Sequence, residues 1–166
     1  DQPPYGKAEG LLKYATRGQA KQGTTYFYRI ASLYLIHQGM RLTLAVVFVH
    51  SGMSLAACIV RLLKQVKAQK IKLGCLFLDR GFAGIEVYRC LQRRRIPAII
   101  ACPIRGKEKG TRALCTKRHS YTTTHTFHSQ AQGNFTAQVV VVRSYTHTGK
   151  RGQRKQRKAA WFLYVL

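Results

Sequence analysis

The chain has 166 residues, 29 of them lysine or arginine and five aspartate or glutamate, which gives a formal net charge of +24. Hydrophobic residues make up 46% of the sequence, which excludes the disordered class of few apolar residues and high net charge. A folded chain this basic needs an anionic partner. Nucleic acid is the first candidate and an anionic membrane surface the second. No apolar run approaches the ~20 residues of a spanning helix, so we expect no membrane insertion.

The predicted elements of the first part alternate between strands and helices. They are a basic loop at 10–24, an antiparallel strand pair within 24–52, a helix at 54–70 capped by Ser54, a strand at 73–78, a helix at about 83–95 and a strand at 97–103. Two apolar strands joined through a helix make a parallel, right-handed crossover. We therefore expect one mixed sheet with helices packed on it.

The second part of the chain is rich in strand-like runs. After a basic linker at 105–118, such runs occupy 121–129, 134–146 and 158–166, with a basic stretch between the last two. This pattern predicts an antiparallel β subdomain with a long basic hairpin tip. We place the boundary between two domains, 1–104 and 105–166, at the start of the linker.

The ends of the sequence and its cysteines indicate the cellular compartment that we expect for the chain. It carries no signal-peptide pattern, so we predict a cytoplasmic protein. The five cysteines are widely spaced and lie mostly in apolar segments, which favours reduced core thiols over disulfides. The sequence starts at Asp1 instead of a methionine and stops at Leu166 inside an apolar run, so we expect further residues at both ends.

Asp79 is one of the few carboxylates, and it directly follows the apolar run at 73–78. In sheets with parallel strands, ligands gather just beyond the carboxyl ends of the strands. A carboxylate there suits a divalent cation, which prefers oxygen ligands. The alternative from the residues alone is a helix N-cap or a partner for a basic residue such as Arg80.

The segment "LFLDRGFAGIEVYRCLQRRRIPAIIACP" around Asp79 resembles the second-aspartate region of DDE-type insertion-sequence transposases, in particular the IS-four-like group. In that group an Asp-Arg-Gly-Phe or Asp-Arg-Gly-Tyr turn follows an apolar strand. The opening "DQPPYGK" is similar to the stretch after the family's first aspartate. The resemblance implies an α/β fold: a ribonuclease-H-like mixed sheet with flanking helices in 1–104, and an antiparallel β-rich insertion in 105–166.

The resemblance also implies a metal-dependent chemistry. The family holds two divalent ions, Mg²⁺ or Mn²⁺, on three carboxylates, and uses them to cleave and join phosphodiesters. Asp79 matches the second aspartate and is the implied metal ligand. If Gly6 aligns with the family's glycine, the first aspartate falls about two or three positions before Asp1. Asp1 matches that aspartate if the spacing is shortened. Glu86 and Glu108 both lack the context of the family's glutamate, so we expect this chain alone to be catalytically incomplete.

Basic residues crowd the predicted hairpin tip. They are Lys150, Arg151, Arg154, Lys155, Arg157 and Lys158. We interpret the tip as a site that contacts DNA phosphates, with the minor groove as one place where it could bind. The alternative is a solvated loop. A second basic run at 92–95 fits favourable charge at a helix C-terminus as well as phosphate binding. A zinc site is a weaker interpretation, because its residues fit no standard finger spacing. They are Cys115, His119, His125 and His128.

Together these features predict part of a transposase that binds transposon-end and target DNA. The resemblance implies cleavage and strand transfer by the intact enzyme, DNA recombination in a prokaryotic, nucleoid-associated setting, and a homodimer on paired ends. The alternative is a basic nucleic-acid-binding protein without catalysis, the remnant of a decayed insertion element. The two hypotheses differ in one requirement: a catalytic transposase needs three carboxylates close together to bind its metal ions, and a non-catalytic protein does not.

Overall fold

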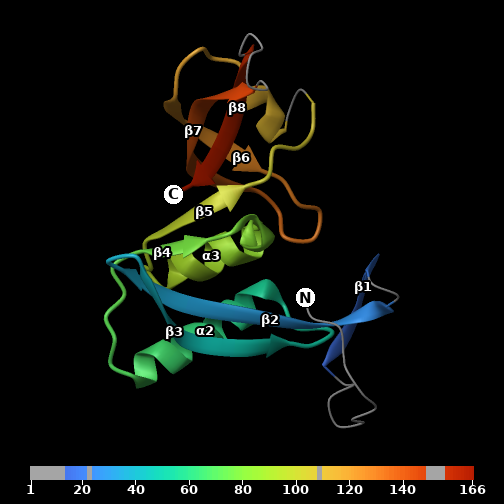
Figure 1. Cartoon of the computed structure of the whole chain (residues 1–166), viewed down its shortest axis with the longest axis vertical. Helices are drawn as coiled ribbons and strands as arrows, with labels where there is room; N and C mark the ends of the chain where they lie inside the picture. Colours follow the sequence, from blue (N-terminus) through green and yellow to red (C-terminus); the bar gives the residue numbers. More distant parts are fainter. Residues whose placement is uncertain (1–13, 22–23, 108–109, 149–155) are drawn as a thin grey trace. The chain divides into compact units, whose positions relative to one another are not determined.

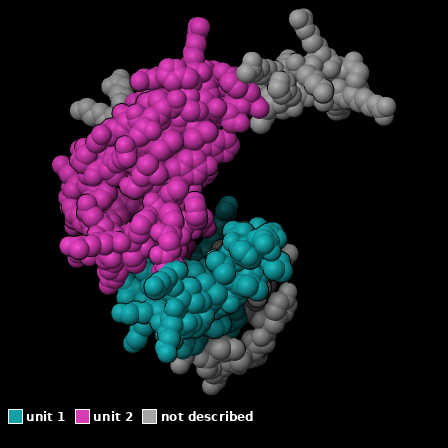
Figure 2. Space-filling view, turned by 90° about the vertical axis from the view of Figure 1, so that its left-hand side faces the viewer, with its two compact units in different colours: residues 1–72 teal, residues 73–166 magenta. Residues whose placement is uncertain are grey.

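The structure of the chain is a computed structural model that describes residues 14–21, 24–107, 110–148 and 156–166. It contains two compact units, Asp1–Lys72 and Leu73–Leu166, which we call unit 1 and unit 2 (Figure 2). Each unit has its own sheet and its own α-helix. The mixed α/β class predicted from the sequence is confirmed.

Unit 1 is built on a three-stranded antiparallel sheet in the order β1-β2-β3 (Figure 1). Its strands are β1 (Ala15–Lys21), β2 (Thr24–His37) and β3 (Met40–Val49). The turn between β2 and β3 places Gln38 and Gly39 at φ values of 47° and 79°. Two successive positive φ angles are typical of the tight hairpin turns whose twist matches that of the strands. The predicted antiparallel pair is confirmed.

Strand β1 corrects the prediction of a loop at 10–24. Its residues are polar and basic, and its own strand propensity is low. It becomes a strand because it pairs with the aromatic start of β2, Ala15 opposite Tyr28 and Arg17 opposite Tyr26. Cross-strand packing of this kind outweighs intrinsic preference.

Helix α2 (Leu55–Ala68) covers one face of this sheet. Ser54 is its N-cap, as predicted, and the Ser54 hydroxyl accepts a hydrogen bond from the Ala57 amide at 3.1 Å. The buried side chains of α2 recur at helical spacing and pack with the inward-facing residues of β3. They are Cys58, Ile59, Leu62 and Val66.

Two glutamines of α2 bind the outer edge of β3. The Gln65 amide accepts from the Val46 N–H and donates to the Val46 carbonyl, both at 3.1 Å. The Gln69 amide donates to the Leu44 carbonyl at 2.7 Å. These side chains supply three hydrogen bonds that a neighbouring strand would otherwise make, to the Val46 amide and carbonyl and to the Leu44 carbonyl.

Unit 2 contains a five-stranded mixed sheet in the order β4-β5-β8-β7-β6 (Figure 1). Its strands are β4 (Leu76–Leu78), β5 (Ala98–Cys102), β6 (Tyr121–Phe127), β7 (Phe135–Thr148) and β8 (Gln156–Val165). Its helices are α3 (Ile85–Arg93) and the 3₁₀ turns η1 (Arg80–Phe82) and η2 (Thr111–Leu114). The β4–β5 pair is parallel, as predicted, and the other pairs are antiparallel.

The composition of the two sheets corrects the expectation of one mixed sheet that unites the first strand pair with the parallel strands. Instead β2 and β3 belong to the sheet of unit 1, and the parallel pair continues into β8. Leu163 lies opposite Cys102 of β5 and Val141 of β7. In this central place the apolar side chains of Leu163 and Val165 are each only 2% exposed, and their burial stabilises the position of β8. The predicted boundary after residue 104 thus falls inside unit 2.

Helix α3 anchors the loops at one end of the unit 2 sheet. The ring of its buried Tyr88 contacts Phe127 and Phe135, with centroid distances of 5.2 and 5.5 Å. Arg89 donates hydrogen bonds to the carbonyls of Gln132 and Asn134, at 2.5 and 2.8 Å. These contacts fix the β6–β7 turn against α3. Among the described residues, no helix is both long and apolar enough to cross a membrane.

Candidate functional site

The carboxyl ends of β4 and β5 lie at the same edge of the unit 2 sheet, because the two strands are parallel and in register from Leu76–Ala98 to Leu78–Ile100. Asp79 follows β4 directly, and Pro103 follows β5 directly. This edge is where α/β sheets commonly bind ligands. The structure therefore places Asp79 where the sequence predicted it.

The Asp79 carboxylate is exposed and acts as a cap. Its Oδ1 accepts a hydrogen bond from the Gly81 amide at 2.8 Å, which makes Asp79 the N-cap of η1. A Cβ at position 81 would lie 3.0 Å from that oxygen, so the glycine leaves the carboxylate room to turn inward. An ionised carboxylate has about four acceptor positions. The cap occupies one of them and leaves the others available to a ligand.

The carboxylates that the metal interpretation requires do not meet among the described residues. No group of three or more His, Cys, Asp or Glu side chains in the described part of the chain could hold a metal ion. Glu86 lies in the first turn of α3, while Asp1 and Glu108 lie outside the described residues. The described residues therefore do not by themselves fit a divalent metal site.

A pocket of about 510 Å³ adjoins the end of β5 within unit 2. Its described lining comes from four segments: the η1–α3 junction, the end of β5, residues 105–106 and 110–111 around the start of η2, and the end of β6 with the turn that follows. Its side chains of chemical interest are Tyr88, Cys102, Arg105, His125 and His128. Sequence reasoning did not find this pocket. Applying the strand-end argument to β5 as well as β4 would have pointed to the residues around Pro103.

The electrostatics of the pocket favour binding over nucleophilic chemistry. Burial raises the pKa of the Cys102 thiol, although Tyr88, Arg105 and Arg80 act in the opposite direction. Burial and the neighbouring Cys102 raise the pKa of Tyr88. Burial and the nearby His128 lower the pKa of His125. At neutral pH the thiol, phenol and His125 imidazole are therefore uncharged.

The four residues of the zinc interpretation do not form a site. His125 packs edge-on against Phe127 at 4.8 Å, and His128 Nδ1 is hydrogen-bonded to Asn134 Oδ1 at 2.9 Å. His119 is exposed near Tyr121, and the Cys115 thiol contacts the carbonyl of Thr111. These four side chains belong to no group of three or more potential metal ligands in the described part of the chain.

The basic hairpin tip lies largely outside the described residues. Lys150, Arg151, Arg154 and Lys155 fall in the gap between β7 and β8. Arg157 and Lys158 belong to β8, where their backbones pair with His147 and Thr146. The interpretation of this tip as a DNA contact stays a prediction.

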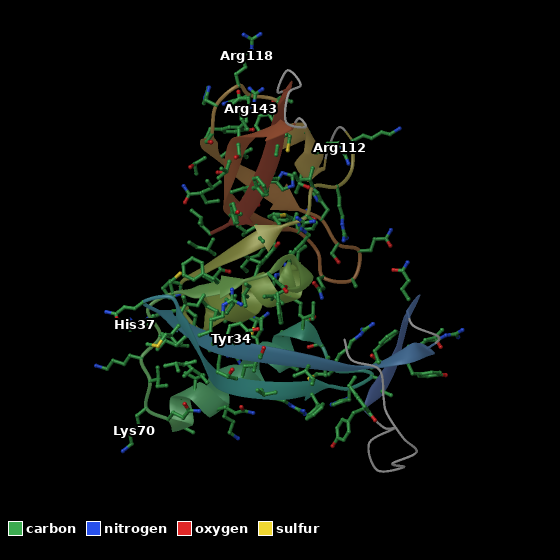
Figure 3. All side chains as sticks on the ribbon, in the orientation of Figure 1. Tyr34, His37, Lys70, Arg112, Arg118 and Arg143 are labelled. Carbon is green, nitrogen blue, oxygen red and sulfur yellow. The ribbon has the colours of Figure 1, made fainter. Side chains whose placement is uncertain are left out.

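Other cations of unit 2 are described. Figure 3 shows Arg112 and Arg118 extending away from the ribbon of the unit. On the β7–β8 hairpin the Arg143 guanidinium lies 5.0 Å from the ring centroids of both Tyr145 and Trp161. Sequence reasoning missed this cation–aromatic group, which the alternation of β7 and the pairing of β7 with β8 bring to one face.

The basic run at 92–95 ends α3. Arg93 is in its last turn, and Arg94 is its C-cap. The Arg94 guanidinium donates to the Cys90 carbonyl at 3.4 Å and contacts the Cys90 sulfur at 3.3 Å. These contacts support the helix-terminus interpretation of the run, in which a cation complements the negative end of the helix.

Comparisons with known proteins add no assignment to these residues. The chain matches no protein-family model, and it has no match among the curated proteins.

Proposed function

We propose that this chain is part of a DDE-type insertion-sequence transposase of the IS-four-like group, and that it binds DNA during transposition. The observation that carries the proposal is the position of Asp79 at the carboxyl end of a parallel strand, in the turn Asp-Arg-Gly-Phe. A carboxylate at this edge is rare in a chain with only five acidic residues. Two copies would act together on paired transposon ends.

The order of elements supports a ribonuclease-H-like arrangement as part of this proposal. The strand pair β2–β3 precedes α2, and the β4–α3–β5 crossover follows. In this view β6, β7 and β8 form the family's β insertion. The separate sheet of unit 1 departs from the single mixed sheet of that fold.

The distribution of charge supports DNA as the partner. Residues 14–72 contain no aspartate or glutamate, so the basic side chains of unit 1 meet no carboxylate within that stretch. Unbalanced positive charge of this size is neutralised well by phosphates, which release condensed counterions when bound. The exposed arginines of unit 2 add to the same field.

We propose metal-dependent chemistry only for an intact enzyme in which two further carboxylates lie close to Asp79. The described residues hold no group of three or more potential metal ligands and do not fit Mg²⁺ or Mn²⁺ by themselves. The proposed role of the described residues is to bind DNA and to hold Asp79 at the sheet edge.

A second candidate is a basic nucleic-acid-binding protein without catalysis. The hydrogen bond from the Gly81 amide to Asp79 favours this second candidate, because capping η1 is a structural role that needs no metal ion. Neither candidate predicts cleavage by this chain alone, so a nicking assay on the Asp79 variant of the intact protein separates them. We expect no magnesium- or manganese-dependent nicking by the 166-residue chain. In an intact transposase, Asp79→Asn should abolish cleavage and spare DNA binding. Cleavage that survives this change would reduce Asp79 to a cap.

A salt titration of duplex binding tests the DNA proposal. Each phosphate contact should contribute about 0.9 to the slope of log affinity against log salt. Changing Arg151, Arg154, Lys155 and Arg157 to glutamine should flatten the slope by a few units on transposon-end and random duplexes alike, since phosphate contacts carry no sequence information.

A matched control variant loses the same number of positive charges at a different place. In this variant four exposed lysines of unit 1 are changed to glutamine: Lys64, Lys67, Lys70 and Lys72. The slope should then fall less than in the tip variant. Equal flattening in both variants would mean that net charge, and not the tip, determines the affinity.

A further inference from the structure

The pocket at the end of β5 has walls that are held in place. The Thr111 hydroxyl donates to the Pro103 carbonyl at 2.7 Å and accepts from the Arg105 amide at 2.9 Å. These two bonds fix the backbone that carries Arg105. Arg89 holds the turn after β6, which also lines the pocket, against α3. A volume of about 510 Å³ lies within the range of about 300–1,000 Å³ that is usual for small-molecule sites.

One part of the lining is apolar and aromatic. Ile85 and Tyr88 come from α3, and Phe127 comes from the end of β6. The Tyr88 ring contacts Phe127, and the His125 ring stands edge-on to Phe127 at an interplanar angle of 88°. Ring edges and faces of this kind pack well against a flat ring of a ligand.

The other part of the lining is cationic or hydrogen-bond donating. Arg105, His125 and His128 line the pocket, and none of the described lining residues is acidic. Gly84 and Ile85 place the start of α3, the positive end of its dipole, in the same wall. Arg105 can pair two of its N–H groups with the oxygens of a phosphate.

We propose that this pocket binds a phosphate monoester that carries an aromatic ring, the chemistry of a nucleoside monophosphate. The phosphate contacts Arg105 and His128, and the ring packs against Tyr88 and Phe127. The ligand is either a free mononucleotide or the 5′-phosphorylated end of a nucleic acid strand. The inference stands apart from the proposed function, because it uses neither Asp79 nor the basic tip.

Calorimetric titration of the 166-residue chain at fixed ionic strength tests the pocket. The probes are AMP, adenosine and inorganic phosphate. We expect AMP to bind at least about tenfold more tightly than either part, because only AMP engages both halves of the lining. If inorganic phosphate bound as tightly as AMP, the pocket would hold an adventitious ion only. If adenosine bound as tightly as AMP, Arg105 and His128 would have no role in binding the phosphate. Either result overturns the proposal, as does the absence of AMP binding.

Two variants locate the binding. Arg105→Gln should weaken AMP about tenfold, which matches the loss of one charge-assisted hydrogen-bonded pair. Its side chain is exposed, so the fold should be retained. His128→Gln should weaken AMP by a smaller factor. The matched control is Arg112→Gln, which removes an exposed charge from η2 outside the lining and should leave the affinity within twofold. Equal weakening by the control would mean non-specific attraction and would overturn the proposal.

Competition distinguishes the two sources of the ligand. A single-stranded oligonucleotide with a 5′-phosphate and its 5′-hydroxyl counterpart are each titrated against bound AMP. If the phosphorylated strand displaces AMP more effectively, the strand end is the ligand. If both strands compete equally weakly, a free mononucleotide is the ligand. The DNA-binding proposal can fail while AMP binding survives, and the reverse also holds.

Discussion

The two units differ in how their sheets are assembled and in what their surfaces carry. In unit 1 each strand pairs with the next in the sequence, and residues 14–72 include no carboxylate. In unit 2 the parallel pair is completed by β8, which follows β5 only after β6 and β7. That unit holds Asp79 and the pocket at adjacent strand ends. Both units are strongly basic, and the comparison indicates that the specific sites lie in unit 2.

The largest expected effect concerns the central strand of unit 2. Leu163 is 2% exposed and packs between β5 and β7. Leu163→Ala should lower the free energy of unfolding by about 2–5 kcal/mol, because it leaves a cavity as well as losing apolar burial. Hydrogen exchange should show the loss of protection in β4–β8 first, with the β2–β3–α2 region of unit 1 retained.

The neighbouring residue is the control for this change. Phe162 is 44% exposed, so Phe162→Ala should cost much less than Leu163→Ala. If the Leu163 variant lost protection in both units together, the units would unfold as one cooperative body and the comparison between them would fail.

The N-caps Ser54 in unit 1 and Asp79 in unit 2 should have smaller effects on stability, and these effects also compare the two units. Ser54 caps the 14-residue α2, and Ser54→Ala should lower the free energy of unfolding by about 1 kcal/mol. Asp79 caps only the three residues of η1. Asp79→Asn keeps an acceptor oxygen for the Gly81 amide, so it should change stability by less than about 0.5 kcal/mol.

Urea denaturation of these variants and of Asp79→Ala measures the cap effects. The alanine change removes the acceptor and should cost more than the asparagine change. A large loss of stability in Asp79→Asn would show that the negative charge itself stabilises unit 2. The carboxylate could then not be treated as available to a ligand.

The smallest effect is the pH dependence of unit 2 stability. The pKa of His125 is lowered from its usual 6.5 by burial and by His128. The unfolded chain therefore binds a proton more readily than the folded one, and stability falls as pH drops through 6.5 toward the lower folded-state pKa. His125→Gln should reduce this fall in thermal unfolding scans.

An exposed histidine provides the control for the pH experiment. His119 lies on the surface before β6, so His119→Gln should keep the pH dependence of the unchanged chain. A His125 variant that also kept it would assign the pH dependence to other groups. The pocket would then not be the pH-sensitive part of unit 2.

Local features of this fold could be predicted from the sequence. Helix α2 followed from Ser54 and a stripe of apolar residues, and the β4–α3–β5 crossover followed from two apolar runs around a helix. The position of Asp79 followed from the same crossover. These features depend on neighbours within a few turns or strands, where spacing and capping carry the information.

The features that were missed depend on distant partners. Strand β1 exists because β2 provides a pairing edge, and the β5–β8 pairing joins residues about 60 positions apart. The pocket takes its walls from four separate segments, so no short motif could indicate it. A single sequence carries no direct signal for such pairings, since many registers satisfy the same alternation.

The glutamine contacts of α2 also have a consequence for self-association. A sheet edge with unpaired backbone groups is a template on which another chain can add a strand. Gln65 and Gln69 already occupy the backbone groups of Val46 and Leu44, through three hydrogen bonds of 2.7 to 3.1 Å. An incoming strand would have to displace these side chains before it could pair there. Unit 1 thus protects this edge of its sheet against aggregation with two neutral side chains, without adding to its large positive charge.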